Sequence, residues 1–178
     1  SNNFTSYLTI ITSALTSMTA RFVTLKIHKG ELQSANEYLS TSFYVNLILS
    51  AIIAVFSVVI VIFLDKIVNI PPNILMDVRL LFAITFVSFI ISVSTSVFHI
   101  AAFCSNRLDV TSVISIVGSL ARILVIAVLF RFLTPHIYYV GLSVLSVTLV
   151  FGIFNYITSR KLMPMLRIRF RDVKMKLV

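Results

Sequence analysis

Long stretches without a charged residue are the feature that most restricts what this chain can fold into. No charged residue occurs in residues 80–106, and Glu31 and Glu37 are the only two in residues 30–64. Isoleucine, valine, leucine and phenylalanine fill these stretches. An apolar helix of about 20 residues is long enough to cross the hydrocarbon core of a bilayer. The sequence therefore predicts an all-α integral membrane protein.

The composition agrees with this fold class, because 58% of the 178 residues are apolar and only 12% are charged. A soluble domain carries about twice that share of charge. We expect a bundle in residues 1–161, followed at 162–178 by a basic cytoplasmic linker or an amphipathic segment on the lipid surface. We interpret the chain as a piece of a longer membrane protein. The five expected spans are residues 4–24, 41–64, 79–102, 110–132 and 137–159.

The distribution of Lys and Arg predicts the orientation of these spans. Eleven of the fifteen fall on one side of the alternating spans, three fall on the other, and Arg122 lies inside a span. Positively charged loops stay in the cytoplasm, so we expect the first residue outside and the basic tail inside. The net charge of +9 flanks apolar segments, which suits anionic lipid headgroups and not nucleic acid.

Polar side chains recur every three or four residues on one face of three expected spans. Such a stripe either lines a watery cavity or packs one helix against another through hydroxyl groups. Because three spans carry one, we favour a shared polar cavity, as a transport path requires. The stripes are Thr5, Thr9, Thr12, Thr16 and Thr19; Thr85, Ser88, Ser92, Thr95 and His99; and Thr111, Ser115, Gly118 and Arg122.

Arg122 is the most informative of these residues, because it lies near the middle of its span. An arginine at the bilayer centre costs about 2.5–3.5 kcal/mol on insertion scales. No Asp or Glu occurs within the five expected spans to pair with it. Either a carboxylate elsewhere pairs with this guanidinium, or it contacts an anion such as phosphate. We favour the anion contact.

The remaining candidates have simpler alternatives. Arg21 also fits an ordinary flank of its span, and His99 also fits helix packing. Asn46 and Asn155 fit hydrogen bonds between neighbouring helices. We find no paired histidines, no cysteine cluster around Cys104 and no phosphate-binding glycine loop, and we expect no cofactor, no metal and no enzymatic activity. The candidate cavity residues are Arg122, Arg21, His99, Thr12, Thr16, Ser88, Ser92, Ser115 and Asn155.

Several segments, taken in order, resemble polysaccharide flippases, the O-antigen or Wzx-type members of the multidrug/oligosaccharidyl-lipid/polysaccharide exporter superfamily. The resemblance covers essentially the whole chain and depends on the order and spacing of all the segments. These are YLTIITSALTSMTARF, KGELQSANEYLSTSFYVN, DKIVNIPPNILMDVRLLF, SNRLD, LTPHIYYVGL and RKLMPMLRIR.

The resemblance implies a two-lobed transporter of twelve to fourteen spans, of which this chain would supply spans two to six. It implies an inner-membrane carrier that flips undecaprenyl-pyrophosphate-linked oligosaccharide outward by alternating access. Arg122 would then attract the pyrophosphate or an acidic sugar. The partners would be the lipid-linked oligosaccharide, membrane lipids and the remainder of the transporter. A multidrug exporter of the same superfamily and a membrane-embedded polysaccharide polymerase or acyltransferase are the alternatives.

Overall fold

The computed structural model describes residues 2–67, 70–132, 136–165 and 168. Within these ranges the chain is helical and forms no β-strand, which confirms the predicted fold class. Most of the predicted basic segment at 162–178 lies outside the described residues. The elements are α1 (Asn2–His28), α2 (Leu32–Ile62), α3 (Leu64–Ile67), η1 (Pro72–Ile74), α4 (Leu75–Thr95), η2 (Ser96–Phe98), α5 (His99–Cys104), α6 (Leu108–Phe132) and α7 (Tyr139–Leu162).

Four segments of the described chain are long and apolar enough to cross a membrane: Leu32–Ile62, Pro72–Cys104, Leu108–Phe132 and Tyr139–Leu162. Their outer surfaces are strongly apolar, as on α6, where Leu120 and Leu124 are 58% and 66% exposed. Such a surface is stable in lipid and unfavourable in water. The chain is therefore an integral membrane protein.

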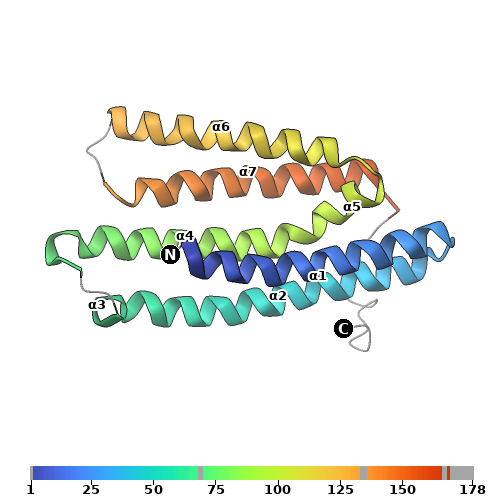
Figure 1. Cartoon of the computed structure of the whole chain (residues 1–178), viewed down its shortest axis with the longest axis horizontal. Coiled ribbons are helices and arrows are strands. Elements are labelled where there is room, and N and C mark those ends of the chain that lie inside the picture. Colours follow the sequence, from blue (N-terminus) through green and yellow to red (C-terminus); the bar gives the residue numbers. More distant parts are fainter. Residues whose placement is uncertain (1, 68–69, 133–135, 166–167, 169–178) are drawn as a thin grey trace.

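The expected first span forms α1, whose 27 residues extend about 40 Å at 1.5 Å per residue. This helix is not among the four spans above, so its crossing of the membrane stays a prediction. It lies alongside α2 (Figure 1).

The long helices run back and forth in one bundle (Figure 1). The α1–α2 turn, the α5–α6 turn and the end of α7 lie at one end, and the α2–α4 connection and the start of α7 lie at the other. Lys29, Arg107 and Arg160 thus share one end, as the alternation predicted. α4 packs against both α2 and α7, whereas α6 packs mainly against α7.

The expected spans 4–24 and 41–64 leave residues 25–40 as the connector between them. In the structure a tight helical hairpin forms there, so the connector is shorter than expected. α1 continues to His28 and α2 already begins at Leu32. Gly30 makes the turn with a φ of 76°, a left-handed conformation that glycine adopts without a Cβ clash. The Lys26 ammonium, 2.6 Å from the Glu31 carboxylate, holds the pKa of that carboxyl below its ordinary value.

The third expected span, 79–102, is interrupted by a 3₁₀ turn. α4 ends at Thr95, η2 occupies Ser96–Phe98, and α5 leaves at an angle (Figure 1). No proline or glycine lies there. Three successive hydroxyls donate to carbonyls of their own helix: Ser94 to Ile90 O at 2.9 Å, Thr95 to Ile91 O at 2.8 Å and Ser96 to Val93 O at 2.8 Å. Such bonds bend helices, which explains the break.

Glycines on α6 and α7 permit close helix packing around α4. A Cβ on Gly118 of α6 would overlap the Phe151 ring of α7. A Cβ on Gly152 of α7 would lie 3.2 Å from Thr95 Cγ2, beside the break in α4. Small residues of this kind let helix backbones approach inside membranes, where van der Waals packing drives association.

The contact of Gly118 with Phe151 predicts a thermodynamic coupling between these residues. We expect Gly118→Ala to lower the free energy of unfolding by about 1–3 kcal/mol, because the added methyl overpacks the α6–α7 interface. Combined with Phe151→Ala, it should cost less than the sum of the two single changes. Unfolding of the complete purified protein by sodium dodecyl sulfate in mixed micelles measures these values. Ser112→Ala, on an exposed position of the same helix, serves as the control, and strict additivity would contradict the packing.

Candidate functional site

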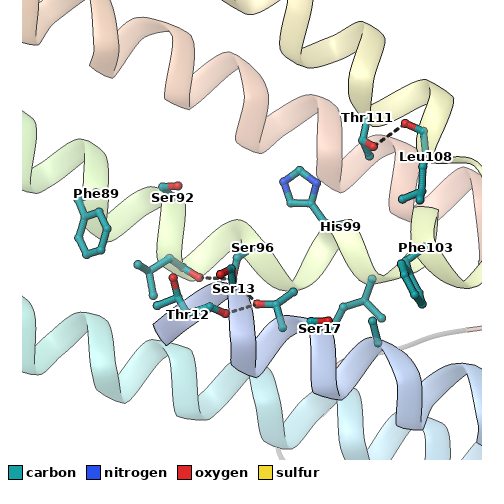
Figure 2. Close-up of a pocket in the computed structure, with 14 residues that line it drawn as sticks. Thr12, Ser13, Ser17, Phe89, Ser92, Ser96, His99, Phe103, Leu108 and Thr111 are labelled. Carbon is teal, nitrogen blue, oxygen red and sulfur yellow. Dashed lines mark hydrogen bonds between the residues drawn. The ribbon is translucent and has the colours of Figure 1, made fainter. Parts of the chain in front are cut away.

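The first of two adjoining pockets, called here the hydroxyl pocket, has a volume of about 360 Å³. It lies between α1, the α4–α5 segment and the start of α6 (Figure 2). Four hydroxyl residues of α1 form one wall, and Phe89 and Phe103 are apolar parts of its lining. The polar residues that line it are Thr12, Ser13, Thr16, Ser17, Ser92, Ser96, His99 and Thr111.

The second pocket, called here the arginine pocket, has a volume of about 390 Å³ and lies between the α4–α5 segment, α6 and α7. Arg122 reaches it from α6, and the buried Asn155 reaches it from α7. Phe151, whose ring packs on Gly118, also lines it. Its polar residues are Ser92, Thr95, Ser96, His99, Ser115, Ser119, Arg122, Thr148 and Asn155.

Ser92, Ser96 and His99 line both pockets, so the break in α4 is their common wall. The His99 ring points into the hydroxyl pocket on the side of Thr111 (Figure 2). Each pocket has a volume within the range of small-molecule sites, about 300–1,000 Å³. Together their polar linings come from α1, the α4–α5 segment, α6 and α7.

Most hydroxyl groups in this region have already donated their single hydrogen to their own helix. Thr16 donates to Thr12 O at 2.8 Å, Thr111 to Leu108 O at 2.8 Å and Ser119 to Ser115 O at 2.9 Å. A hydroxyl that donates in this way still has oxygen lone pairs. The pocket walls therefore offer mainly acceptors, and the strong donors come from Arg122, Asn155 and His99.

Arg122 forms no ion pair with any residue that the structure describes. It is exposed on the pocket side of α6, within a segment apolar enough to span the membrane. Its five N–H donors are thus available to a guest. A guanidinium in this position attracts anions, and phosphate matches its fork geometry.

Seven of the nine predicted cavity residues line these two pockets. Thr12 and Thr16 line the hydroxyl pocket, and Ser115, Arg122 and Asn155 line the arginine pocket. Ser92 and His99 line both. The roles of all seven in binding stay predictions.

Two predicted residues line neither of these two pockets. Ser88 is 2% exposed and donates to Ile84 O at 2.8 Å, so it is part of the packed interior of the bundle. Arg21 is exposed on α1, and its role stays a prediction. Thr5 and Thr9 lie outside the residues whose side chains are described.

The sequence reasoning missed Ser96, which lines both pockets. Ser96 follows Ser92 by four residues and precedes His99 by three, so it also fits helical spacing, but the predicted stripe took the adjacent Thr95 in its place. The spacing and the run of hydroxyl residues Ser94, Thr95 and Ser96 were the available signals. The expected interhelical bond of Asn46 is confirmed, because its Nδ2 donates to Ser96 Oγ at 3.0 Å. Asn155 forms no such bond within the described part of the chain.

The chain is 31% identical over 174 residues to a Bacillus subtilis protein named uncharacterized membrane protein EpsK. The match covers 98% of this chain and 34% of EpsK, so the chain spans about one third of the length of that relative. No family model and no solved structure matches the chain. Likeness to a membrane protein and the four apolar spans identify the chain as a multi-pass membrane protein.

Cysteine labelling of the complete protein tests whether the arginine pocket contains water. In a Cys104→Ala background, Ser119→Cys in this pocket should react at least about tenfold faster than Leu120→Cys with a charged methanethiosulfonate reagent, because thiolate forms in water and not in lipid. Both positions are exposed on α6, which makes Leu120→Cys the matched control. Equal reaction rates in leaky membrane vesicles would show that the pocket is dry.

Proposed function

We propose that this chain forms part of a polysaccharide flippase of the bacterial plasma membrane. Its cargo would be undecaprenyl-pyrophosphate-linked oligosaccharide, moved outward by alternating access. The observation that carries the proposal is Arg122, placed without an ionic partner among the described residues in a polar pocket at membrane depth. The segment-by-segment resemblance to flippases supports the same cargo.

The two pockets suit the two polar parts of such a cargo. A pyrophosphate is an anion that accepts hydrogen bonds, which the Arg122 guanidinium and the Asn155 amide would donate. Sugar hydroxyls donate hydrogen bonds, which the acceptor-rich serines and threonines of both pockets would receive. The lipid tail would stay in the bilayer, outside the pockets.

The orientation and the wider assembly belong to the same proposal. The end of the bundle that carries Lys29, Arg107 and Arg160 faces the cytoplasm, and the first residue faces outward. The rest of the transporter covers the open side of the pockets. No chemical step occurs, because transport requires only a change of access.

A multidrug exporter is the weaker alternative. Its cationic substrates would be repelled by Arg122, which no described carboxylate neutralises. A polymerase or acyltransferase would need a catalytic set of acid, base or nucleophile, whereas hydroxyls already bonded to helix carbonyls dominate these pockets.

The proposal predicts that Arg122→Gln abolishes export. In the organism that carries the gene, a deletion strain should lose its surface polysaccharide and accumulate lipid-linked oligosaccharide on the cytoplasmic face. The wild-type protein should restore export, Arg122→Gln should leave it at the level of the deletion, and Arg122→Lys should restore it in part, because a lysine keeps the charge without the fork. Radiolabelled lipid-linked sugar and surface polymer are the measurements.

Arg131→Gln, which removes an exposed arginine from the last turn of the same helix, is the matched control and should export normally. Membrane insertion of every variant is checked by immunoblot. Normal export by Arg122→Gln would overturn the role of this residue. A deletion strain that still displays single repeat units would indicate a polymerase, and one that only gains sensitivity to cationic drugs would indicate a drug exporter.

A further inference from the structure

A further pocket, called here the aromatic pocket, lies at the end of the bundle where α7 ends (Figure 1). It has a volume of about 200 Å³ and lies between α2, the α4–α5 segment and the last turns of α7. It shares no lining residue with the hydroxyl pocket or the arginine pocket. The proposed cargo path therefore does not account for this pocket.

Three aromatic rings, called here the aromatic row, form one side of the pocket. The Phe43 ring of α2 lies 6.3 Å from the Phe98 ring of η2, centroid to centroid. The Phe98 ring lies 5.2 Å from the Tyr156 ring of α7, with an angle of 78° between the two planes, a favourable edge-to-face geometry. The buried Val97 and Ala101 extend this apolar lining. Three parts of the bundle thus present hydrocarbon to the pocket.

The polar edge of the pocket comes from Ser159 and Arg160, close to the end of α7. The Arg160 guanidinium carbon lies 5.5 Å from the centroid of the Tyr156 ring. Arg160 is exposed and forms no ion pair with any residue that the structure describes. Contact with a ring face leaves the N–H donors of a guanidinium available to an anion.

The pocket therefore suits a guest that is anionic at one end and apolar at the other. A free anion would gain nothing from the aromatic row, and a neutral guest would leave the guanidinium without an ionic partner. The volume lies below the range of complete small-molecule sites, about 300–1,000 Å³. The pocket would thus hold one part of a larger molecule, and the rest of that molecule would lie in the surrounding bilayer.

The position of the pocket along α7 corresponds to the level of the lipid headgroups. α7 is apolar enough to span a membrane, and its last turn carries Arg160 and Lys161. Arginine and tyrosine at the end of a span reach the membrane–water interface. Basic pockets between spans on the cytoplasmic side bind anionic headgroups. Only the choice of the cytoplasmic leaflet rests on the orientation proposed above, because the pocket itself is independent of the cargo.

We propose that the aromatic pocket binds one anionic phospholipid of the surrounding membrane. Its phosphate contacts Arg160 and Ser159, and the start of one acyl chain lies against the aromatic row. Phe98 of this row belongs to the same break that forms the common wall of the hydroxyl and arginine pockets. The bound lipid therefore contacts the broken segment from the side opposite to the cargo.

Native mass spectrometry of the complete purified protein counts the bound lipids in micelles that contain phosphatidylglycerol or phosphatidylcholine. With identical acyl chains, these two lipids differ only in the headgroup and its charge. Wild type should retain one more phosphatidylglycerol than Arg160→Gln, in which the affinity of this site should fall at least about tenfold through loss of a charge-assisted bond. Arg160→Lys should keep part of the affinity, because lysine keeps the charge without the fork.

Lys161→Gln is the matched control for Arg160→Gln. It removes a positive charge from the adjacent residue, which is also exposed in the last turn of α7 but does not line the pocket. It should bind phosphatidylglycerol as wild type does. Equal lipid counts for Arg160→Gln and Lys161→Gln would overturn the proposal. Equal retention of phosphatidylcholine and phosphatidylglycerol by wild type would also overturn it.

A phosphatidylglycerol with a diazirine at the start of one acyl chain locates the site. In wild type and Lys161→Gln it should label the peptides that contain Phe43 or Phe98 in preference to the peptide with the exposed Leu120 of α6. Arg160→Gln should lose this preference. Even labelling of these peptides in wild type would indicate only the lipid that surrounds every membrane protein and would overturn the proposal. Inorganic phosphate that bound as tightly as the lipid would indicate an anion site without an acyl chain and would overturn it as well.

Discussion

The interaction on which this structure depends is the hydrogen bond from a serine or threonine hydroxyl to a carbonyl of its own helix. In a membrane, a donor without a partner costs several kcal/mol. The bond from Thr16 to Thr12 O, at 2.8 Å, satisfies that donor locally, so a polar helix face no longer needs a partner helix. The oxygen lone pairs remain available. The same bond thus permits polar pockets at membrane depth and determines that their walls are acceptors.

These bonds also shape the bundle at one decisive point. Where three hydroxyls follow one another at Ser94–Ser96, their bonds to carbonyls compete with the regular helix, and α4 gives way to a 3₁₀ turn. The break changes the direction of α5 and places His99 between the two pockets. It also places Ser96 opposite Asn46 of α2. Local chemistry of side chains therefore decides where the two pockets meet.

Composition and periodicity were sufficient for the fold class and for much of the candidate site. Arg122 and Ser115 share a pocket with Asn155 of another helix, and spacing alone had placed the first two on one face of α6. Spacing does not reveal which helices are neighbours, so the packing of α4 between α2 and α7 could not be predicted. Ser88 belongs to the stripe by spacing, yet it is buried in the bundle. Ser96 was missed although it lies four residues after Ser92 and three before His99, because the adjacent Thr95 fits the same period and spacing alone does not choose between the two.

The free-energy cost of a guanidinium in lipid determines what can cover the side of α6 that carries Arg122. A guanidinium at membrane depth is unfavourable unless water, a carboxylate or an anionic guest surrounds it. The described chain supplies no carboxylate to it, and α6 packs mainly against α7. Contact between lipid and the pocket side of α6 is therefore unfavourable, and this side needs either water or further helices beside it. The chain spans about one third of the length of EpsK. Further helices that enclosed this face would place Arg122 in the wall of a closed, hydrated cavity.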